Sequence, residues 1–65
     1  MKYAVLAMNK ETLKNEPVIE RRTLRSAMYH AECAAQDLGT SAIVMSIAEN
    51  KLLAKYTEKG TLLIF

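Results

Sequence analysis

Most of the side chains that could carry out chemistry in this chain lie between positions 20 and 33, in the segment ERRTLRSAMYHAEC. The segment contains three arginines, a tyrosine, and the only histidine and cysteine of the sequence. Clustered arginines beside an aromatic ring are typical of nucleic-acid binding, and a cysteine near a histidine is the minimal pair for thiol chemistry. A third interpretation is that the segment forms the solvent-facing side of a helix.

The nucleic-acid interpretation depends on Arg21, Arg22 and Arg25, with Tyr29 placed one helical turn after Arg25. Carboxylates interrupt this basic cluster: Glu16, Glu20, Glu32 and Asp37. The net charge is only +2, and the sequence has neither a helix-turn-helix arrangement nor a pair of stacking aromatics on its strands. Binding of nucleic acid by Arg21, Arg22 and Arg25 is therefore the alternative function, which nucleic-acid absorbance in the purified protein would support.

Thiol catalysis would need Cys33 as the nucleophile and His30 as its base. The two residues are three positions apart, so they can be neighbours on a helix surface. No third group that could orient the histidine is apparent, and no helix N-terminus lies close enough to lower the pKa of the thiol. One cysteine and one histidine also cannot supply the usual four protein ligands of a structural zinc site. We therefore expect no enzymatic activity, no metal and no cofactor.

The length of 65 residues allows a single small domain that spans positions 1–65. A domain of this size buries only about 60% of the surface that its unfolded chain exposes, so a lone copy is marginally stable. The single cysteine excludes an internal disulfide, which leaves self-association as the main source of further stability. No apolar run approaches the roughly 20 residues of a membrane span, and a lone thiol without a signal peptide favours a cytoplasmic location.

Helical periodicity is the clearest pattern in the sequence. Seven apolar residues share one face over positions 24–38: Leu24, Ala27, Met28, Ala31, Ala34, Ala35 and Leu38. Thr23 precedes them as an N-cap and Gly39 follows as a C-terminal glycine, which predicts a helix between these two residues. On this helix Arg25, Tyr29 and Cys33 point away from the apolar stripe.

Patterns of strand-forming residues flank the predicted helix on both sides. They predict strands over residues 3–8, 41–48, 51–57 and 61–65, with a tight turn at 49–50 and a hairpin loop at 58–60. Residues 17–22 fit either an edge strand that begins at Pro17 or the first turns of the helix, and the periodicity favours the strand. The expected fold class is α+β: one amphipathic helix packed on a small, mostly antiparallel sheet of three to five strands, in the order β-(β)-α-β-β-(β).

One helix covers one face of a sheet, yet these strands carry apolar side chains on both faces. An apolar face without a cover is usually an interaction surface, so we expect a homodimer. Its two sheets would pack face to face, or join edge to edge through the terminal strand. The predicted interface has Val5 and Val44 on the uncovered face and Phe65 in the terminal strand.

The outer face of the helix offers a second surface, formed by Arg25, Tyr29 and Cys33, for another protein partner. Tyr29 and Cys33 are one turn apart at positions where lysine or glutamate would be expected on a solvated face. Taken together, the patterns indicate a small non-enzymatic protein–protein interaction or regulatory protein that associates with itself through the sheet face not covered by its helix.

Overall fold

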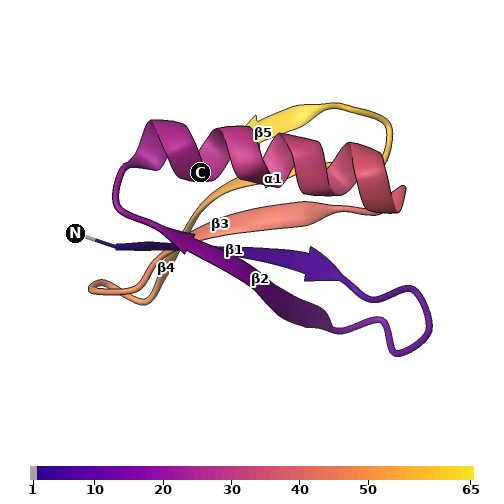
Figure 1. The fold of residues 1–65 in the computed structure, drawn as a ribbon, viewed down its shortest axis with the longest axis horizontal. Helices are drawn as coiled ribbons and strands as arrows, with labels where there is room; N and C mark the ends of the chain where they lie inside the picture. Colours follow the sequence, from indigo (N-terminus) through magenta and orange to yellow (C-terminus); the bar gives the residue numbers. More distant parts are fainter. Residues whose placement is uncertain (1) are drawn as a thin grey trace.

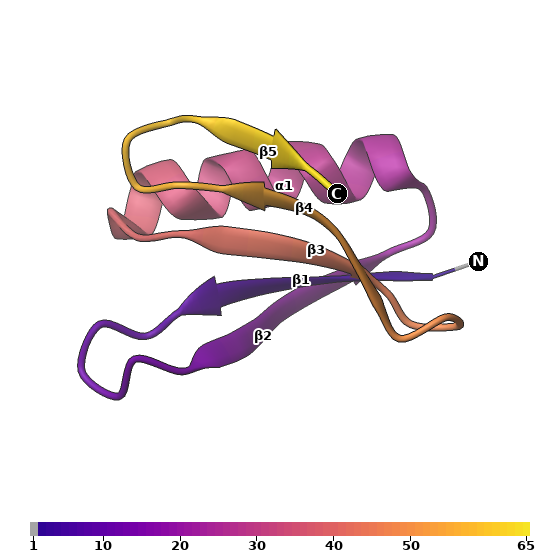
Figure 2. The same cartoon turned by 180° about the vertical axis from the view of Figure 1, so that it is seen from behind.

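Five strands and one helix form the fold in a computed structural model that describes residues 2–65 (Figure 1). The strands are β1 (Tyr3–Met8), β2 (Asn15–Arg21), β3 (Ala42–Ser46), β4 (Lys51–Tyr56) and β5 (Leu62–Ile64), and the helix is α1 (Leu24–Leu38). The order across the sheet is β2-β1-β3-β4-β5, so β2 and β5 are its two edges (Figure 2). Every neighbouring pair of strands is antiparallel, which confirms the predicted α+β class.

Strand β2 settles the open question about residues 17–22, because this segment pairs with β1 and does not join the helix. The proline has no N–H to donate, and an edge strand tolerates it because one side of that strand needs no partner. The register moves by one residue between Val5, opposite Ile19, and Leu6, opposite Pro17, so Val18 is the extra residue of a bulge. In the loop before β2, the Asn9 side chain accepts a hydrogen bond of 2.8 Å from the N–H of Glu11.

Helix α1 begins and ends where its capping residues predict. The Thr23 hydroxyl accepts a hydrogen bond of 3.2 Å from the N–H of Ser26. Gly39 has a φ of 62°, and its N–H donates to the carbonyl of Ala35. Leu24 and Leu38, which were predicted to be part of the buried stripe, are 39% and 58% exposed because they lie at the two ends of the helix.

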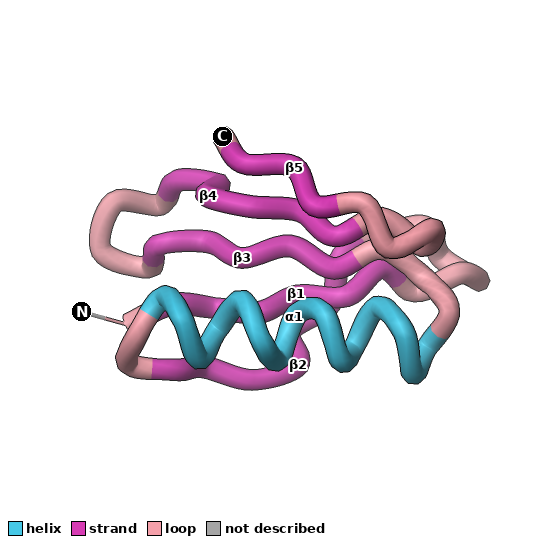
Figure 3. Tube along the Cα trace, turned by 90° about the horizontal axis from the view of Figure 1, so that it is seen from above, coloured by secondary structure: helices cyan, strands magenta, loops and turns pink. Residues whose placement is uncertain are grey.

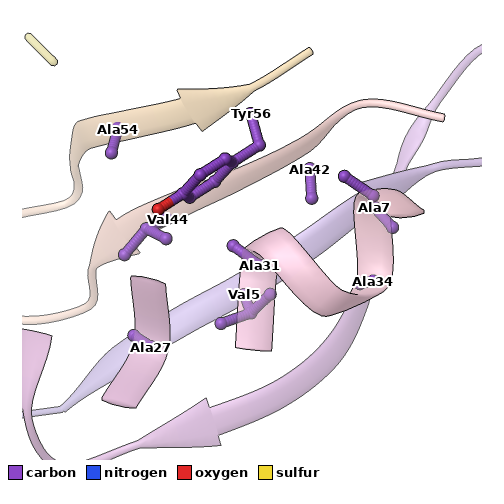
Figure 4. Packing of buried hydrophobic residues seen from close by; sticks show 10 residues of the cluster. Val5, Ala7, Ala27, Ala31, Ala34, Ala42, Val44, Ala54 and Tyr56 are labelled. Atoms are coloured by element: carbon purple, nitrogen blue, oxygen red, sulfur yellow. The ribbon is translucent and has the colours of Figure 1, made fainter. Parts of the chain in front are cut away.

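The core lies between α1 and one face of the sheet, and it is built mainly from small side chains (Figure 4). The helix contributes only alanines to the fully buried cluster: Ala27, Ala31, Ala34 and Ala35. The sheet contributes small residues and one tyrosine: Val5, Ala7, Ala42, Val44, Ala54 and Tyr56. An alanine stripe lets the helix approach the sheet closely, so there is little volume to fill between the two layers.

Val5 and Val44 are the one clear error in the predicted interface, because both have 0% exposure beneath the helix. Strand alternation divides the residues of β1 and β3 into two sets, and both sets are apolar. Periodicity alone cannot tell which set the helix covers. On β3 the helix packs on the set with the smaller side chains and leaves Ile43 and Met45 on the opposite face. On β1 the covered set also contains Tyr3, which packs partly buried against the core.

The connections on either side of β4 differ in how well the sequence predicted them. Strand β3 ends at Ser46 and not at residue 48, because the buried Ser46 hydroxyl accepts a hydrogen bond of 3.3 Å from the N–H of Glu49 and starts a four-residue turn. Asn50 closes this turn with a φ of 50°. The loop before β5 is confirmed, with Gly60 at a φ of 87° and its N–H donating to the Thr57 carbonyl.

Candidate interaction surfaces

The three arginines of the sequence-predicted site differ in their surroundings. Arg21 is the last residue of β2 and is half-buried, and its Nε donates a hydrogen bond of 3.0 Å to the hydroxyl of Ser26 in the first turn of α1. Arg22 and Arg25 are exposed. This hydrogen bond links the end of β2 to the helix, so Arg21 has a structural role. Nucleic-acid binding by this cluster stays a prediction.

Tyr29 lies on the outer side of α1 beside Cys33, one helical turn away as the spacing predicted, and it also contacts the adjacent His30. The rings of Tyr29 and His30 meet edge to face, with 5.6 Å between their centroids. Tyr29 is 64% exposed, and a hydrogen bond with the side chain of Cys33 is the main cause that raises the pKa of its phenol, followed by the charge that the Cys33 thiolate would carry. Cys33 is half-buried.

This outer helix patch of Arg25, Tyr29 and Cys33 is a convex surface. Neither hollow described on the surface of residues 2–65 has any of these three residues in its lining. No group of three or more histidine, cysteine or acidic side chains that could hold a metal ion is found among the described residues. The patch can offer an aromatic ring, a positive charge and a thiol to another molecule, and binding to another protein there stays a prediction.

The face of the sheet opposite α1 carries an apolar surface that the helix does not cover, and its members follow from the strand register. We call this surface the open face: Ala4, Leu6, Met8, Ile43, Met45, Leu52 and Leu63. One cross-strand row runs from Leu6 through Ile43 and Lys55 to Leu63. The aliphatic part of a lysine can lie along such an apolar surface while its ammonium group reaches water. The open face is therefore apolar across four of the five strands.

A second row of the open face runs from Glu20 through Ala4 and Met45 to Leu52. Glu20 lies at the β2 margin, and Lys55 of the first row lies on β4, so the two charges of opposite sign are on opposite sides of the apolar centre. Sequence analysis identified the second apolar face but named the wrong residues for it. The signal that could have found the right ones is side-chain size on β3, since an alanine-rich helix fits best on the smaller set of that strand.

The terminal segment, β5 with Phe65, is the most exposed apolar part of the chain. Leu62, Leu63, Ile64 and Phe65 have exposures of 40%, 43%, 66% and 61%. Figure 3 shows why the helix does not cover this segment: α1 lies over the β1 side of the sheet, and β5 is at the far edge. Phe65, named from the sequence as an interface residue, is exposed here, and its N–H donates to the Leu53 carbonyl at 3.0 Å.

A shallow groove of about 460 Å³ lies between the β1–β2 connection and the C-terminal end of α1. Its lining includes Lys10, Glu11, Glu16, Leu38 and Thr40. Thr40 is 1% exposed, and its hydroxyl has no hydrogen-bond partner among residues 2–65. Sequence reasoning missed this residue, because a single threonine after a helix C-terminus carries no pattern. The mixed charges of the groove do not define one class of ligand.

Comparison of the chain with protein-family models, with curated proteins and with solved structures gave no match. Within the described residues, α1 is too short and too polar to cross a lipid bilayer. The function must therefore be inferred from the surfaces of the chain itself, of which the open face and the β5 edge are the most apolar.

Proposed function

We propose that this chain is a small protein–protein interaction module that binds a second copy of itself through the open face. The observation that carries the proposal is the inverted distribution of side-chain size about the sheet. Apart from the partly buried Tyr3, the apolar side chains on the covered side of β1 and β3 are valine and alanine, whereas Leu6, Ile43 and Met45 lie on the side that the helix does not cover. Folding of one copy leaves these larger side chains only partly buried.

Burial of the open face against a second copy would increase the free energy of unfolding, which is small for a single domain of this size. Full burial of a leucine, isoleucine or methionine side chain contributes about 1.5–3 kcal/mol, and the half-buried ones on this face retain part of that gain for association. A specific interface buries about 800 Å² on each partner, which is less than a fifth of the 4520 Å² that one copy exposes. The proposed interface is therefore of a size that one face of this sheet and its margins can supply.

A second copy is a suitable partner because the charges on the open face do not repel the same face of another copy. Lys55 and Glu20 have opposite signs and lie on opposite sides of the apolar centre. When two such faces pack about a two-fold axis that runs along the strands, the β4 side of one copy lies over the β1 side of the other. Lys55 then approaches the side that carries the partner's Glu20, and no pair of like charges is forced together.

The experiment is a measurement of absolute mass in solution by light scattering, for the wild-type chain and for Met45→Glu. Met45 is on the open face and outside the core cluster, so the variant should keep its helix content while its mass decreases. Leu13→Glu is the matched control, since it places the same charge at a leucine that is 72% exposed in the β1–β2 connection. A wild-type mass equal to the 7.3 kDa of one chain, or a folded Met45→Glu with unchanged mass, would contradict the proposal.

A further inference from the structure

The two edges of the sheet are protected to very different degrees. Natural sheets guard exposed edges with proline, charged side chains and bulges, because unguarded backbone groups pair with other strands. Edge strand β2 has all three devices: Pro17, the acidic residues Glu16 and Glu20, and the bulge at Val18. Edge strand β5 has none of them, since it consists of Leu62, Leu63 and Ile64. The length of three residues is the one protective feature of β5, so β5 is the less protected of the two edges.

The hydrogen bonds between β4 and β5 show which backbone groups are directed outward. The Thr61 carbonyl accepts from the N–H of Thr57 at 2.9 Å, and the N–H of Phe65 donates to the carbonyl of Leu53 at 3.0 Å. Backbone groups alternate in direction along an antiparallel strand, so residues 61, 63 and 65 are directed toward β4. The N–H and C=O groups of Leu62 and Ile64 are therefore directed away from the sheet.

We infer that β5 pairs antiparallel with β5 of a second copy, about a two-fold axis that passes through Leu63. This register places Leu62 opposite the partner's Ile64 and Ile64 opposite the partner's Leu62. Both positions have outward backbone groups, so each pair exchanges two hydrogen bonds and the strand is its own complement. The assembled sheet has ten strands, with both helices on the same side. The inference goes beyond the proposed function, because it uses the edge and not the open face.

Side chains agree with this register on both sides of the sheet. Leu62 and Ile64 pair with Tyr56 and Ala54, both core residues, so they lie on the helix side, beyond the part that α1 covers. Pairing brings each of them beside an apolar partner. On the other side Leu63 meets the partner's Leu63 as a non-hydrogen-bonded pair, in which side chains come closest together. No charged side chain of β5 is buried by this contact.

Pairing of β5 with β5 of one second copy is favoured over the growth of an open chain of many copies. Pairing of β5 with the β2 edge of another copy would produce an open filament, and the proline, acidic residues and bulge of β2 oppose it. Pairing of β5 with itself closes after two copies. It also leaves the open face accessible.

The direct test is amide hydrogen exchange of Leu62 and Ile64, followed by NMR as the protein is diluted. Pairing predicts protection of both amides that is lost on dilution, by roughly tenfold or more if the contact at each amide is worth about 1.4 kcal/mol. Phe65 is the internal control, since its N–H is bonded within one copy and should change less. Rapid exchange of Leu62 and Ile64 in concentrated protein would overturn the inference.

Two variants test the pairing of β5 without changing the fold of one copy. Ile64→Pro removes an outward N–H that β4 does not use, so it should abolish pairing while helix content and the thermal midpoint of the core are kept. Ile64→Val is the matched control, because it keeps the N–H and the branched side chain, and it should keep the pairing. An assembly whose mass is the same in Ile64→Pro and Ile64→Val would contradict the inference.

Failure of the edge inference can be distinguished from failure of the proposed function by mass. If both contacts exist, Met45→Glu alone leaves pairs joined through β5, Ile64→Pro alone leaves pairs joined through the open face, and the double variant is a single chain. If only the open face is an interface, Met45→Glu is already a single chain and Leu62 and Ile64 exchange freely. If only the edge is an interface, Ile64→Pro is a single chain and Met45→Glu does not change the mass.

Discussion

Shortening Val44 to alanine tests whether the core lies where the structure places it. Val44 is in the middle of β3 and has 0% exposure, and it packs in the core among Val5, Tyr56 and alanines of the helix (Figure 4). The substitution removes the equivalent of two methylene groups, and at about 0.8 kcal/mol each this costs roughly 1.6 kcal/mol of burial. The side chains of the neighbouring alanines are too short to move into the space that is left. We therefore expect an additional cost for the cavity and a total loss of about 2–3 kcal/mol.

Such a loss is large for a chain of this size. A stability of 0.05–0.15 kcal/mol per residue gives roughly 3–10 kcal/mol for the whole protein. Each kcal/mol corresponds to about 4–8 °C in the thermal midpoint of a small domain, so Val44→Ala should melt roughly 10–20 °C below the wild-type protein. Thermal unfolding followed by circular dichroism measures this directly, at a protein concentration held constant because self-association shifts the midpoint.

Val18→Ala is the matched control, because it removes the same atoms from a valine that is 49% exposed on the β2 edge. Its effect should stay within about 0.5 kcal/mol. The mass of Val44→Ala in solution should remain that of the wild-type protein wherever the variant is folded, since Val44 lies on the covered side of the sheet. Equal midpoints for the two variants would refute the reasoning. A decrease in the mass of Val44→Ala without a decrease in its thermal midpoint would place Val44 on the interface, where strand alternation in the sequence predicted it.

Three further outcomes follow from single contacts. Thr23→Ala removes the N-cap of α1 and should cost about 1 kcal/mol in urea unfolding, whereas no loss would mean that the cap is redundant. Thr40→Val replaces a buried hydroxyl that lacks a partner among residues 2–65, so it should raise stability by about 1 kcal/mol, and a destabilised variant would show that the hydroxyl is bonded in solution. Cys33→Ala removes both the hydrogen bond and the thiolate charge that raise the pKa of Tyr29. The pKa of Tyr29 should therefore decrease toward its ordinary value in an NMR titration of its ring, and an unchanged pKa would mean that the contact is not formed.

The core and the proposed interfaces are linked by the composition of α1. A helix that contributes only alanines to the buried cluster can lie close to the sheet but contributes little apolar volume. Leu6, Ile43 and Met45 are then left on the open face, and the apolar side chains of β5 at its edge, where another chain can cover them. Limited packing within one copy and strong packing between copies are, in this interpretation, two consequences of the same small helix residues.

Local features of the fold could be predicted from the sequence because local chemistry determines them. Thr23 and Gly39 define the ends of the helix through bonds to residues three and four positions away, and Gly60 accommodates a left-handed turn before β5. The end of strand β3 was predicted two residues too late, because the bond from Glu49 to the Ser46 hydroxyl leaves no mark in the apolar pattern. The 17–22 segment remained open since Pro17 is compatible with the start of a strand and of a helix.

What the sequence by itself determined is that the sheet has two apolar faces and one helix to cover them. It did not determine which face the helix takes, because hydrophobic burial is non-directional and both sets of alternating residues gain from it. Only the tertiary structure decided this, through the fit between the alanine stripe and the set that contains Val5 and Val44. That choice left Leu6, Ile43 and Met45 on the open face, since the pleat of a strand sends neighbouring side chains to opposite sides.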